Sequence, residues 1–233
     1  MVKFAVVLKT GGDYDSSYVE RVERMAKKNL SVAHEFVCLS DVPGVPGYQP
    51  LYNCWPGWWS VIELFRLTGP VIVTGLDTLI VKNIDRLGEL ALTCPEDVFY
   101  MSRPQPKAAR RGEKWCSGIM IWNGDWSWLY HKFDYETHSK KYKLEQRYTA
   151  HMLSLKRRVK IRAVQDYFDG YTSYKNDCKR GLPAGAKVVL FHGKPRPHEC
   201  KAKWVKKIWD DSWRFEHPFE SLCTVGEDEI EEE

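Results

Sequence analysis

The feature that most constrains the fold is the continuous apolar run PVIVTGL at residues 70–76. A strand that is apolar at nearly every position is buried on both faces, as happens in parallel sheets covered by helices. Two earlier β-rich runs, 3–8 and 35–40, alternate with helical patterns at 17–30 and 58–67. This alternation predicts an α/β fold with a Rossmann-like, mostly parallel sheet flanked by helices.

The rest of the chain continues the same pattern. Ser17 and Glu20 form a capping box, which predicts the start of the first helix. Further apolar runs that would extend the sheet lie at 98–101, 118–122, 159–164 and 187–191. Further helical patterns lie at 126–133, 142–155 and 202–210. Because no repeat or linker divides the chain, we expect one domain over residues 1–226, followed by an acidic disordered tail at 227–233.

Charge and cysteine usage limit the function classes. The tail holds six of the 31 acidic side chains, so residues 1–226 have 35 basic against 25 acidic side chains, a net charge of +10. A basic body favours a polyanionic partner. Seven scattered cysteines without a C-x-x-C pair are typical of reduced thiols in a cytoplasmic protein. The apolar run before Lys9 is too short for a signal segment or a membrane span, so we expect no membrane partner.

Asp77 follows the apolar run directly. Ligands of open α/β sheets bind beyond the carboxyl ends of the strands, and a carboxylate there is costly unless a cation or hydrogen bonds compensate it. Two interpretations follow. Asp77 is a ligand of Mn²⁺ or Mg²⁺, which prefer oxygen donors, or it caps the next turn.

A second strand end, at residues 188–191, leads into His192, Gly193 and Lys194. A glycine lets the backbone approach a diphosphate closely, a lysine supplies positive charge, and a neutral imidazole binds metals. A core role is the alternative for His192. The cysteines and histidines in this region match no structural zinc pattern: Cys178, His192, His198 and Cys200.

Aromatic and basic side chains indicate where a sugar or a nucleic acid would bind. Of the ten tryptophans, Trp58 and Trp59 precede a helix in a Pro/Gly-rich stretch, and aromatic faces stack on sugars and bases. Basic runs are often only solvated surface, but several of them on a basic body favour a phosphate-binding groove. The candidate phosphate contacts are Arg110, Arg111, Lys156, Arg157 and Arg158.

Seven segments, taken in order, resemble bacterial and phage glycosyltransferases with the GT-A fold, which are distantly similar to glycogenin and to the retaining lipopolysaccharide galactosyltransferases. The segments are VVLKTGGDY, FVCLSDVPG, WPGWWSVIELF, VIVTGLDTLIVKNID, WCSGIMIWNGDW, SYKNDCKRGLP and VVLFHGKPRP. The resemblance covers about residues 3–210. It implies the GT-A fold and transfer of glucose or another hexose from a UDP-sugar, with a divalent cation, Mn²⁺ or Mg²⁺.

The resemblance also implies a role for each matching residue. Asp77 and His192 would bind the metal, while Glu145 would lie near the reacting carbon and Gln146 would orient the sugar. Asp166 and Asp169 are reserve candidates for the catalytic carboxylate. The residues expected to bind the nucleotide sugar are Leu8, Lys9, Thr10, Leu76, Asp77, Ser117, Gly118, Lys175, Gly193 and Lys194.

Two departures from the family pattern bear on the chemistry. Gly75 stands where the D-x-D motif has its first acid, so one expected contact with a metal or ribose is missing. The G-D-Q segment of the family reads Leu144, Glu145 and Gln146 here, so the catalytic carboxylate would be a glutamate in place of an aspartate.

The acceptor is inferred from charge and from the resemblance to phage enzymes that modify DNA. We expect transfer to the hydroxymethyl group of 5-hydroxymethylcytosine in DNA, with the target base flipped out of the duplex. A glycosyltransferase acting on lipopolysaccharide or another surface glycan is the first alternative. A catalytically inactive nucleic-acid-binding module on the same fold is the second, and Gly75 is the residue that favours it.

Overall fold

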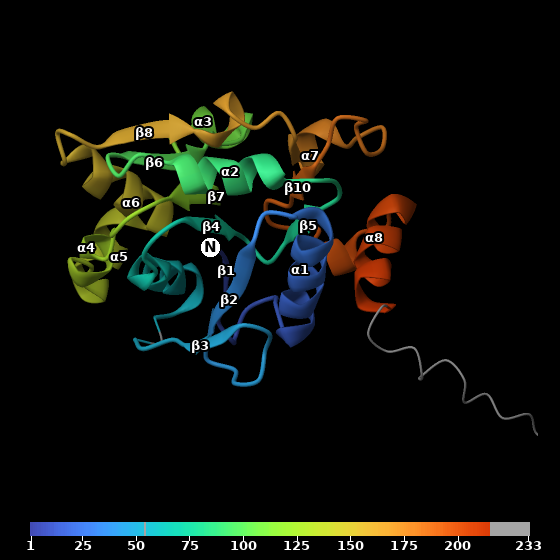
Figure 1. Cartoon of the computed structure of the whole chain (residues 1–233), viewed down its shortest axis with the longest axis horizontal. Coiled ribbons are helices and arrows are strands. Elements are labelled where there is room, and N and C mark those ends of the chain that lie inside the picture. The colour runs from blue at the N-terminus through green and yellow to red at the C-terminus, as the bar shows by residue number, and fades with distance from the viewer. Residues whose placement is uncertain (54, 215–233) are drawn as a thin grey trace, which may run out of the picture.

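The computed structural model describes residues 1–53 and 55–214 (Figure 1). Its centre is a seven-stranded sheet in the order β3-β2-β1-β4-β7-β6-β8. These strands are β1 (Val2–Leu8), β2 (His34–Ser40), β3 (Tyr48–Pro50), β4 (Val71–Thr74), β6 (Val98–Ser102), β7 (Cys116–Trp122) and β8 (Lys160–Ala163). All neighbours pair in parallel except at β7, which runs antiparallel to β4 and β6. The predicted α/β fold with a mostly parallel sheet is confirmed.

A second sheet of three strands has the order β5-β10-β9. Its strands are β5 (Thr78–Ile80), β9 (Tyr171–Ser173) and β10 (Val188–Leu190). The prediction that residues 187–191 extend the main sheet is therefore wrong. The turn after β4 leads the chain out of the main sheet into β5, and β10 pairs antiparallel with β5 instead.

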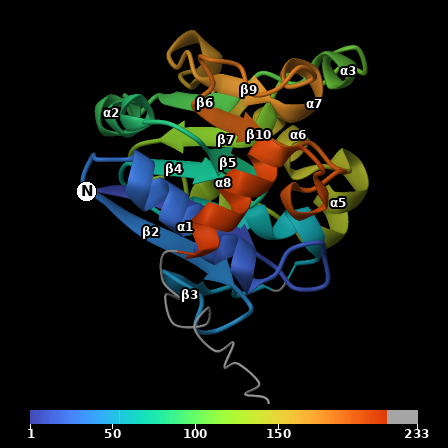
Figure 2. The ribbon, with the colours of Figure 1, turned by 90° about the vertical axis from the view of Figure 1, so that its right-hand side faces the viewer.

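Helices cover both faces of the main sheet. One layer contains α1 (Ser16–Asn29), α2 (Asp85–Thr93) and α8 (Lys203–Arg214), and α1 and α8 lie side by side in Figures 1 and 2. The other layer contains η1 (Gly57–Arg66), α4 (Trp128–His131), α5 (Tyr135–Tyr142) and α6 (Glu145–Ser154). Short helices connect these elements: α3 (Pro106–Ala109), η2 (Val164–Asp166), α7 (Tyr174–Asp177) and η3 (Pro197–Glu199). Within the described residues, no helix has the length and apolar character that a membrane span needs.

The core consists of two apolar layers, one on each face of the sheet. Along β7, Ile119 and Ile121 pack into the layer of α1, while Met120 and Trp122 pack into the layer of η1. Alternate side chains of a strand point to opposite faces, so a strand buried on both faces is apolar at successive positions. This explains why the apolar runs predicted the central strands correctly.

Three local predictions need correction. The first helix is capped by Asp15, whose carboxylate accepts the Ser17 amide at 3.0 Å, so Ser17 is not the cap. The helix predicted at 142–155 forms as α6 but starts three residues later, because Lys143 adopts a left-handed conformation that ends the preceding helix, α5. Of the helix predicted at 126–133, only α4 forms. As a result of the break at Lys143, Glu145 is the first residue of α6.

The acidic tail predicted at 227–233 lies outside the described residues, as do residues 215–226 of the predicted domain. The single domain over 1–226 stays a prediction.

Candidate active site

The candidate site lies at the carboxyl end of β1, where the strand order of the sheet changes direction. The sheet continues from β1 to β2 on one side and to β4 on the other, and the carboxyl ends of strands at such a switch point form a ligand-binding crevice. Lys9 and Thr10 follow β1, and Asp77 follows β4. Because β7 is antiparallel to β4, its first residues, including Ser117 and Gly118, lie at this same edge. The donor-site residues predicted on these three strands therefore share one edge of the sheet.

Lys9 and Thr10 are held by Asp41, which follows β2 and was not predicted. Asp41 accepts the Lys9 ammonium at 2.6 Å, and the Thr10 amide and hydroxyl at 2.9 and 2.5 Å. Partial burial opposes ionisation of Asp41, but these hydrogen bonds outweigh it and lower its pKa. An acid directly after a strand, in the segment FVCLSD, was the signal that could have identified this residue.

Asp77 is not a free carboxylate. Its Oδ2 accepts the Tyr14 phenol at 2.7 Å and Nη1 of Arg196 at 2.6 Å. Arg196 also donates through Nε to Asp13 at 3.0 Å, and its guanidinium lies 4.8 Å from the centre of the Tyr14 ring. Burial raises the pKa of Asp77, and the contacts with Tyr14 and Arg196 oppose that effect. No role was predicted from the sequence for Asp13, Tyr14 or Arg196, although all three lie in the quoted segments, the first two in VVLKTGGDY and the last in VVLFHGKPRP.

His192 lies beside Asp77, because the Phe191 amide donates to the Asp77 carbonyl at 3.3 Å where β10 pairs with β5. Its Nε2 is buried and has no hydrogen-bond partner among the described residues. Burial, together with the nearby Lys175, lowers the pKa of His192 to about 4, so the imidazole is neutral near pH 7. A neutral imidazole with an unused nitrogen can bind a ligand.

The backbone segments that hold the two predicted metal ligands are thus adjacent, but the surroundings of Asp77 do not fit a resident divalent cation. Oδ2 of Asp77 is already occupied by a guanidinium and a phenol. Within residues 1–53 and 55–214, no group of three or more His, Cys, Asp or Glu side chains is arranged to hold a metal ion. A cation at Oδ2 of Asp77 would have to displace Arg196.

Gly75 contributes to this arrangement. A Cβ atom at position 75 would lie 2.9 Å from Oδ1 of Asp77, closer than such atoms approach in real structures. The Asp77 carboxylate therefore leans over the place where the D-x-D motif has its first acid. An acid at position 75 would require Asp77 to move.

The predicted catalytic pair lies next to the predicted sugar-binding residues. Ser117 donates its hydroxyl to Glu145 at 2.5 Å, and its amide lies 3.5 Å from the side-chain oxygen of Gln146. Glu145 is 6% exposed, and this burial raises its pKa. Burial also raises the pKa of Cys116 to about 11, and both Glu145 and Asp77 add to that effect.

Gly118 and Gly193 are required where segments approach closely. A Cβ atom on Gly118 would lie 2.6 Å from the Leu190 side chain, so only glycine lets β7 contact β10. Gly193 has a φ of 71°, a left-handed conformation that favours glycine, and Lys175 Nζ lies 3.7 Å from where its Cβ would be. Lys175 is thus at the predicted diphosphate site.

Lys194 does not have the predicted position. It is 69% exposed and pairs with Glu199 at 3.0 Å, while Arg196, two residues later, is the cation at Asp77. The reserve carboxylates are also engaged at the surface, since Asp166 pairs with Arg103 at 2.5 Å and Asp169 with Lys187 at 2.6 Å.

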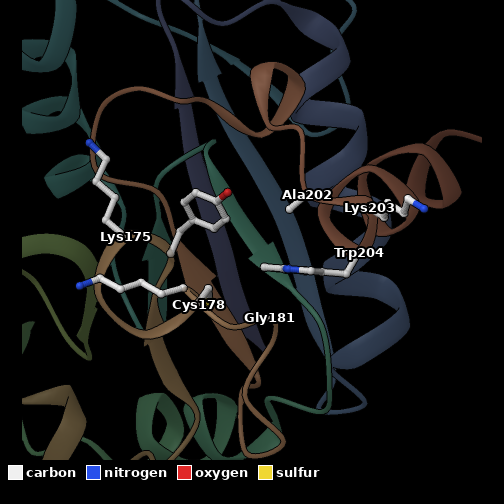
Figure 3. A pocket seen from close by; sticks show the side chains of 8 residues that line it. Lys175, Cys178, Gly181, Ala202, Lys203 and Trp204 are labelled. Carbon is white, nitrogen blue, oxygen red and sulfur yellow. The ribbon is translucent and has the colours of Figure 1, made fainter.

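Two pockets border the site. One of about 600 Å³ has Lys175 and Trp204 on opposite sides, as Figure 3 shows. The other, of about 320 Å³, lies between residues 112–115 and α6, and Gln146 connects it with Ser117. Its lining includes Lys114, Trp115, Gln146, Arg147 and His151.

The predicted acceptor contacts differ in exposure. Trp58 is 55% exposed, whereas Trp59 is 6% exposed and stacks on Phe133 with ring centres 5.4 Å apart. The prediction for Trp59 is corrected: it is a core residue. The basic candidates are all exposed: Arg110, Arg111, Lys156, Arg157 and Arg158.

The sequence matches no family model and no curated protein. Solved structures do match. The galactosyltransferase LgtC, in complex with donor and acceptor sugar analogs, has a TM-score of 0.59 and 12% identity over 97% of this chain and 98% of LgtC. The glycosyltransferase GlyE of Streptococcus pneumoniae has a TM-score of 0.60 and 11% identity over 90% of this chain and 59% of GlyE. The bifunctional glycosyltransferase WbbM has a TM-score of 0.53 and 8% identity, covering 90% of this chain and 51% of WbbM.

At these identities the likeness shows the fold. The chain has the GT-A glycosyltransferase fold, with a mostly parallel central sheet flanked by helices.

Proposed function

We propose that the chain is a glycosyltransferase that moves glucose or another hexose from a UDP-sugar to a hydroxyl acceptor. One observation carries the proposal: Asp77 and the pair formed by Ser117 and Glu145 lie at the same sheet edge, beside the β1–β4 switch point. In this fold class, that edge is where ligands bind.

The donor is assigned to the residues around this edge. The nucleoside would contact Lys9 and Thr10, which Asp41 holds in place. Leu8 and Leu76 have side chains buried in the core, so they would contribute through their backbone. The diphosphate would lie against Gly193 and Lys175, near the unused nitrogen of His192. Lys194 would join them only by leaving Glu199. The donor sugar would border Ser117 and Gly118.

The transfer breaks the bond between the anomeric carbon and the β-phosphate oxygen, whose electron pair leaves with the diphosphate. The acceptor oxygen bonds to the anomeric carbon and releases its proton. Positive charge develops on the sugar in the transition state, as in glycoside hydrolysis. We assign Glu145, in its ionised form, to stabilise that charge, and Gln146 to orient the sugar.

A Mn²⁺ or Mg²⁺ ion between Asp77 and His192 is the second way to hold the diphosphate. The unpartnered Nε2 of His192 supports it. The ion pair between Asp77 and Arg196 opposes it, because the guanidinium already neutralises this carboxylate and occupies its Oδ2.

For the acceptor we propose DNA containing 5-hydroxymethylcytosine. The smaller pocket lies between residues 112–115, which follow Arg110 and Arg111, and α6, which precedes Lys156. Both segments that line this pocket are therefore next to exposed basic residues in the sequence, and Gln146 is one of the pocket's lining residues. Phosphate contacts would position the DNA, while the pocket would bind the modified base.

A surface glycan is the other acceptor class, and the solved complex of LgtC with an acceptor sugar analog favours it. The two classes differ in their charge. A glycan acceptor needs no polyphosphate backbone, so its transfer would depend only weakly on salt.

We propose the cytoplasm, or the host cytoplasm for a viral protein, as the location. The five cysteines with described side chains are free thiols, in accord with a reducing compartment.

The test is incubation with a panel of UDP-sugars and, in parallel, 5-hydroxymethylcytosine DNA, unmodified DNA and a lipopolysaccharide oligosaccharide. Mass analysis of digested nucleosides and of the oligosaccharide gives donor and acceptor together. A hexose on 5-hydroxymethylcytosine alone supports the proposal. A hexose on the oligosaccharide alone shifts the acceptor to a glycan.

A further inference from the structure

Arg196 is the cation that the fold directs at Asp77. It belongs to the loop between β10 and α8, where η3 and an amide contact fix it: the Arg196 N–H donates to Glu199 at 2.8 Å. The Arg196 and Asp77 side chains are 19% and 15% exposed, so the pair is largely shielded from solvent but can still be reached by a ligand.

The guanidinium has unused donors. Nε donates to Asp13 at 3.0 Å and Nη1 to Asp77 at 2.6 Å, while Nη2 has no hydrogen bond within the part of the chain that the structure describes. A guanidinium has five N–H donors in a planar fork whose geometry matches phosphate oxygens. Two contacts with acids therefore orient Arg196 and leave N–H groups for an anion.

The surroundings favour a guanidinium over a divalent cation at this carboxylate. Tyr14 is a partly buried phenol whose raised pKa keeps it protonated, and it donates to the same Asp77 oxygen as Arg196. Gly75 offers no second carboxylate, and Oδ1 of Asp77 leans over that position. A hard cation needs several oxygen ligands, whereas the two acids at this site, Asp77 and Asp13, are each already paired with Arg196.

We propose that Arg196 takes the place of a divalent cation and binds the diphosphate of the nucleotide-sugar donor. The inference rests on the proposed glycosyltransferase function. Asp77 and Asp13 hold the guanidinium in position, and its free N–H groups contact the β-phosphate oxygens. When the sugar–phosphate bond breaks and its electron pair moves to the diphosphate, Arg196 stabilises the added negative charge. Donor binding then needs no metal ion.

The test is calorimetric titration of UDP alone, in EDTA and in Mn²⁺, into the wild-type chain and Arg196→Ala. The wild type is expected to bind UDP with the same Kd, within about twofold, in both conditions. Arg196→Ala is expected to bind roughly tenfold or more weakly in EDTA, since a charge-assisted hydrogen bond is removed. Mn²⁺ is expected to restore binding to this variant, because Asp77 and Asp13 lose their guanidinium partner and their carboxylates can then hold the ion.

Rescue by Mn²⁺ is a result that loss of folding cannot produce. Arg196→Lys keeps the charge but has one nitrogen where Arg196 has three, so a smaller decrease of affinity in EDTA is expected. Arg86→Ala, which breaks an exposed pair with Glu89, is the matched control and is expected to bind UDP like the wild type.

The outcomes distinguish failure of the role of Arg196 from failure of the proposed glycosyltransferase function. A wild-type chain that binds UDP only with Mn²⁺, or an Arg196→Ala variant that binds like the wild type in EDTA, overturns the role of Arg196 alone. No binding of UDP by the wild type in either condition overturns the proposed function and this inference with it.

Discussion

The hydroxyl of Ser117 donates to Glu145 at 2.5 Å and so ties the start of β7 to the first turn of α6. Ser117 is expected to border the donor sugar, and Glu145 is expected to lie near its reacting carbon. Because Glu145 is the first residue of α6, the helix N-terminus favours its ionised form, while burial opposes it. The balance of these effects gives testable consequences.

Glu145→Gln should lower the rate of transfer by about 10²–10⁴-fold, the range typical for loss of a catalytic carboxyl group. The substitution keeps an oxygen that can accept the Ser117 hydroxyl, so the fold should be retained. Initial rates of UDP release measure the effect. Glu136→Gln, at an exposed pair with Lys140, is the matched control and should act like the wild type. A fully active Glu145→Gln would remove Glu145 from the mechanism.

The stability of the same variant should depend on pH. The pKa of Glu145 is raised on folding, so between its unfolded and folded values the folded state holds a proton that the unfolded state releases. As pH rises through this window, starting at about 4, the wild type should become less stable by about 1.4 kcal/mol for each pH unit that the window spans. Glu145→Gln has no such decrease. The Tm of Glu145→Gln should therefore rise relative to that of the wild type across the window, and the difference should then stay constant at higher pH. A Tm difference between the variant and the wild type that stays constant from about pH 4 to 8 would contradict the raised pKa of Glu145.

Much of the fold could be predicted from the sequence, because strands buried on both faces leave continuous apolar runs such as 70–76. The carboxyl-end rule then indicated the site: the residues after β1 and β4 do share one edge. The sheet partner of residues 187–191 could not be predicted, since an apolar run does not specify which neighbour it pairs with. Here the turn after β4 places β5 outside the main sheet, and β5 is the strand with which these residues pair.

Side-chain directions were the harder part. Lys194 and Arg196 are both basic residues of one loop, and charge alone favours neither. Glu199 draws Lys194 outward and accepts the Arg196 amide, so Arg196 is the residue at Asp77. Trp58 and Trp59 differ in the same way, because adjacent positions of the 3₁₀ helix η1 face different directions, so that one is exposed to solvent and the other packs on Phe133.

Gly118→Ala should destabilise the chain by about 1–3 kcal/mol, the cost of inserting a carbon into a packed core. The new Cβ would lie 2.6 Å from Leu190, which is buried and has little room to move. Thermal unfolding checks this, with a Tm decrease of about 2–4 °C for each kcal/mol in a chain of this size. Gly185→Ala, where nothing lies within 4 Å, is the control and should leave Tm unchanged. Equal Tm values for both variants would mean that β7 and β10 are not in close contact.

Trp58→Ala and Trp59→Ala should separate acceptor binding from packing. Trp59 is buried, so its removal should cost about 3–5 kcal/mol of stability. Trp58 is exposed, so its removal should change stability by about 0.5 kcal/mol or less while raising the KM for the acceptor. Chemical denaturation and acceptor titrations measure the two effects. An unchanged acceptor KM in Trp58→Ala would exclude Trp58 from the acceptor site.

Replacing Lys156, Arg157 and Arg158 with glutamine should weaken DNA binding and flatten its salt dependence. The slope of log K against log salt should fall by about 0.9 for each phosphate group that the variant no longer neutralises. Titrations of duplex DNA between low and moderate salt give the slope. Lys27→Gln and Lys28→Gln on α1, which covers the opposite face of the sheet, form the control. If the triple variant keeps the wild-type slope, these residues do not bind phosphate.

The most direct test of the account is the release of UDP from UDP-sugars by the purified chain without any acceptor. A transferase should hydrolyse its donor slowly, whereas a binding module on the same fold should release nothing. We expect measurable UDP from at least one UDP-hexose, and a decrease of about 100-fold or more in Asp77→Ala and His192→Ala variants that unfold at nearly the wild-type temperature. No UDP from any donor, or wild-type release by both variants, would contradict an active centre at the edge of the sheet where β1 and β4 end.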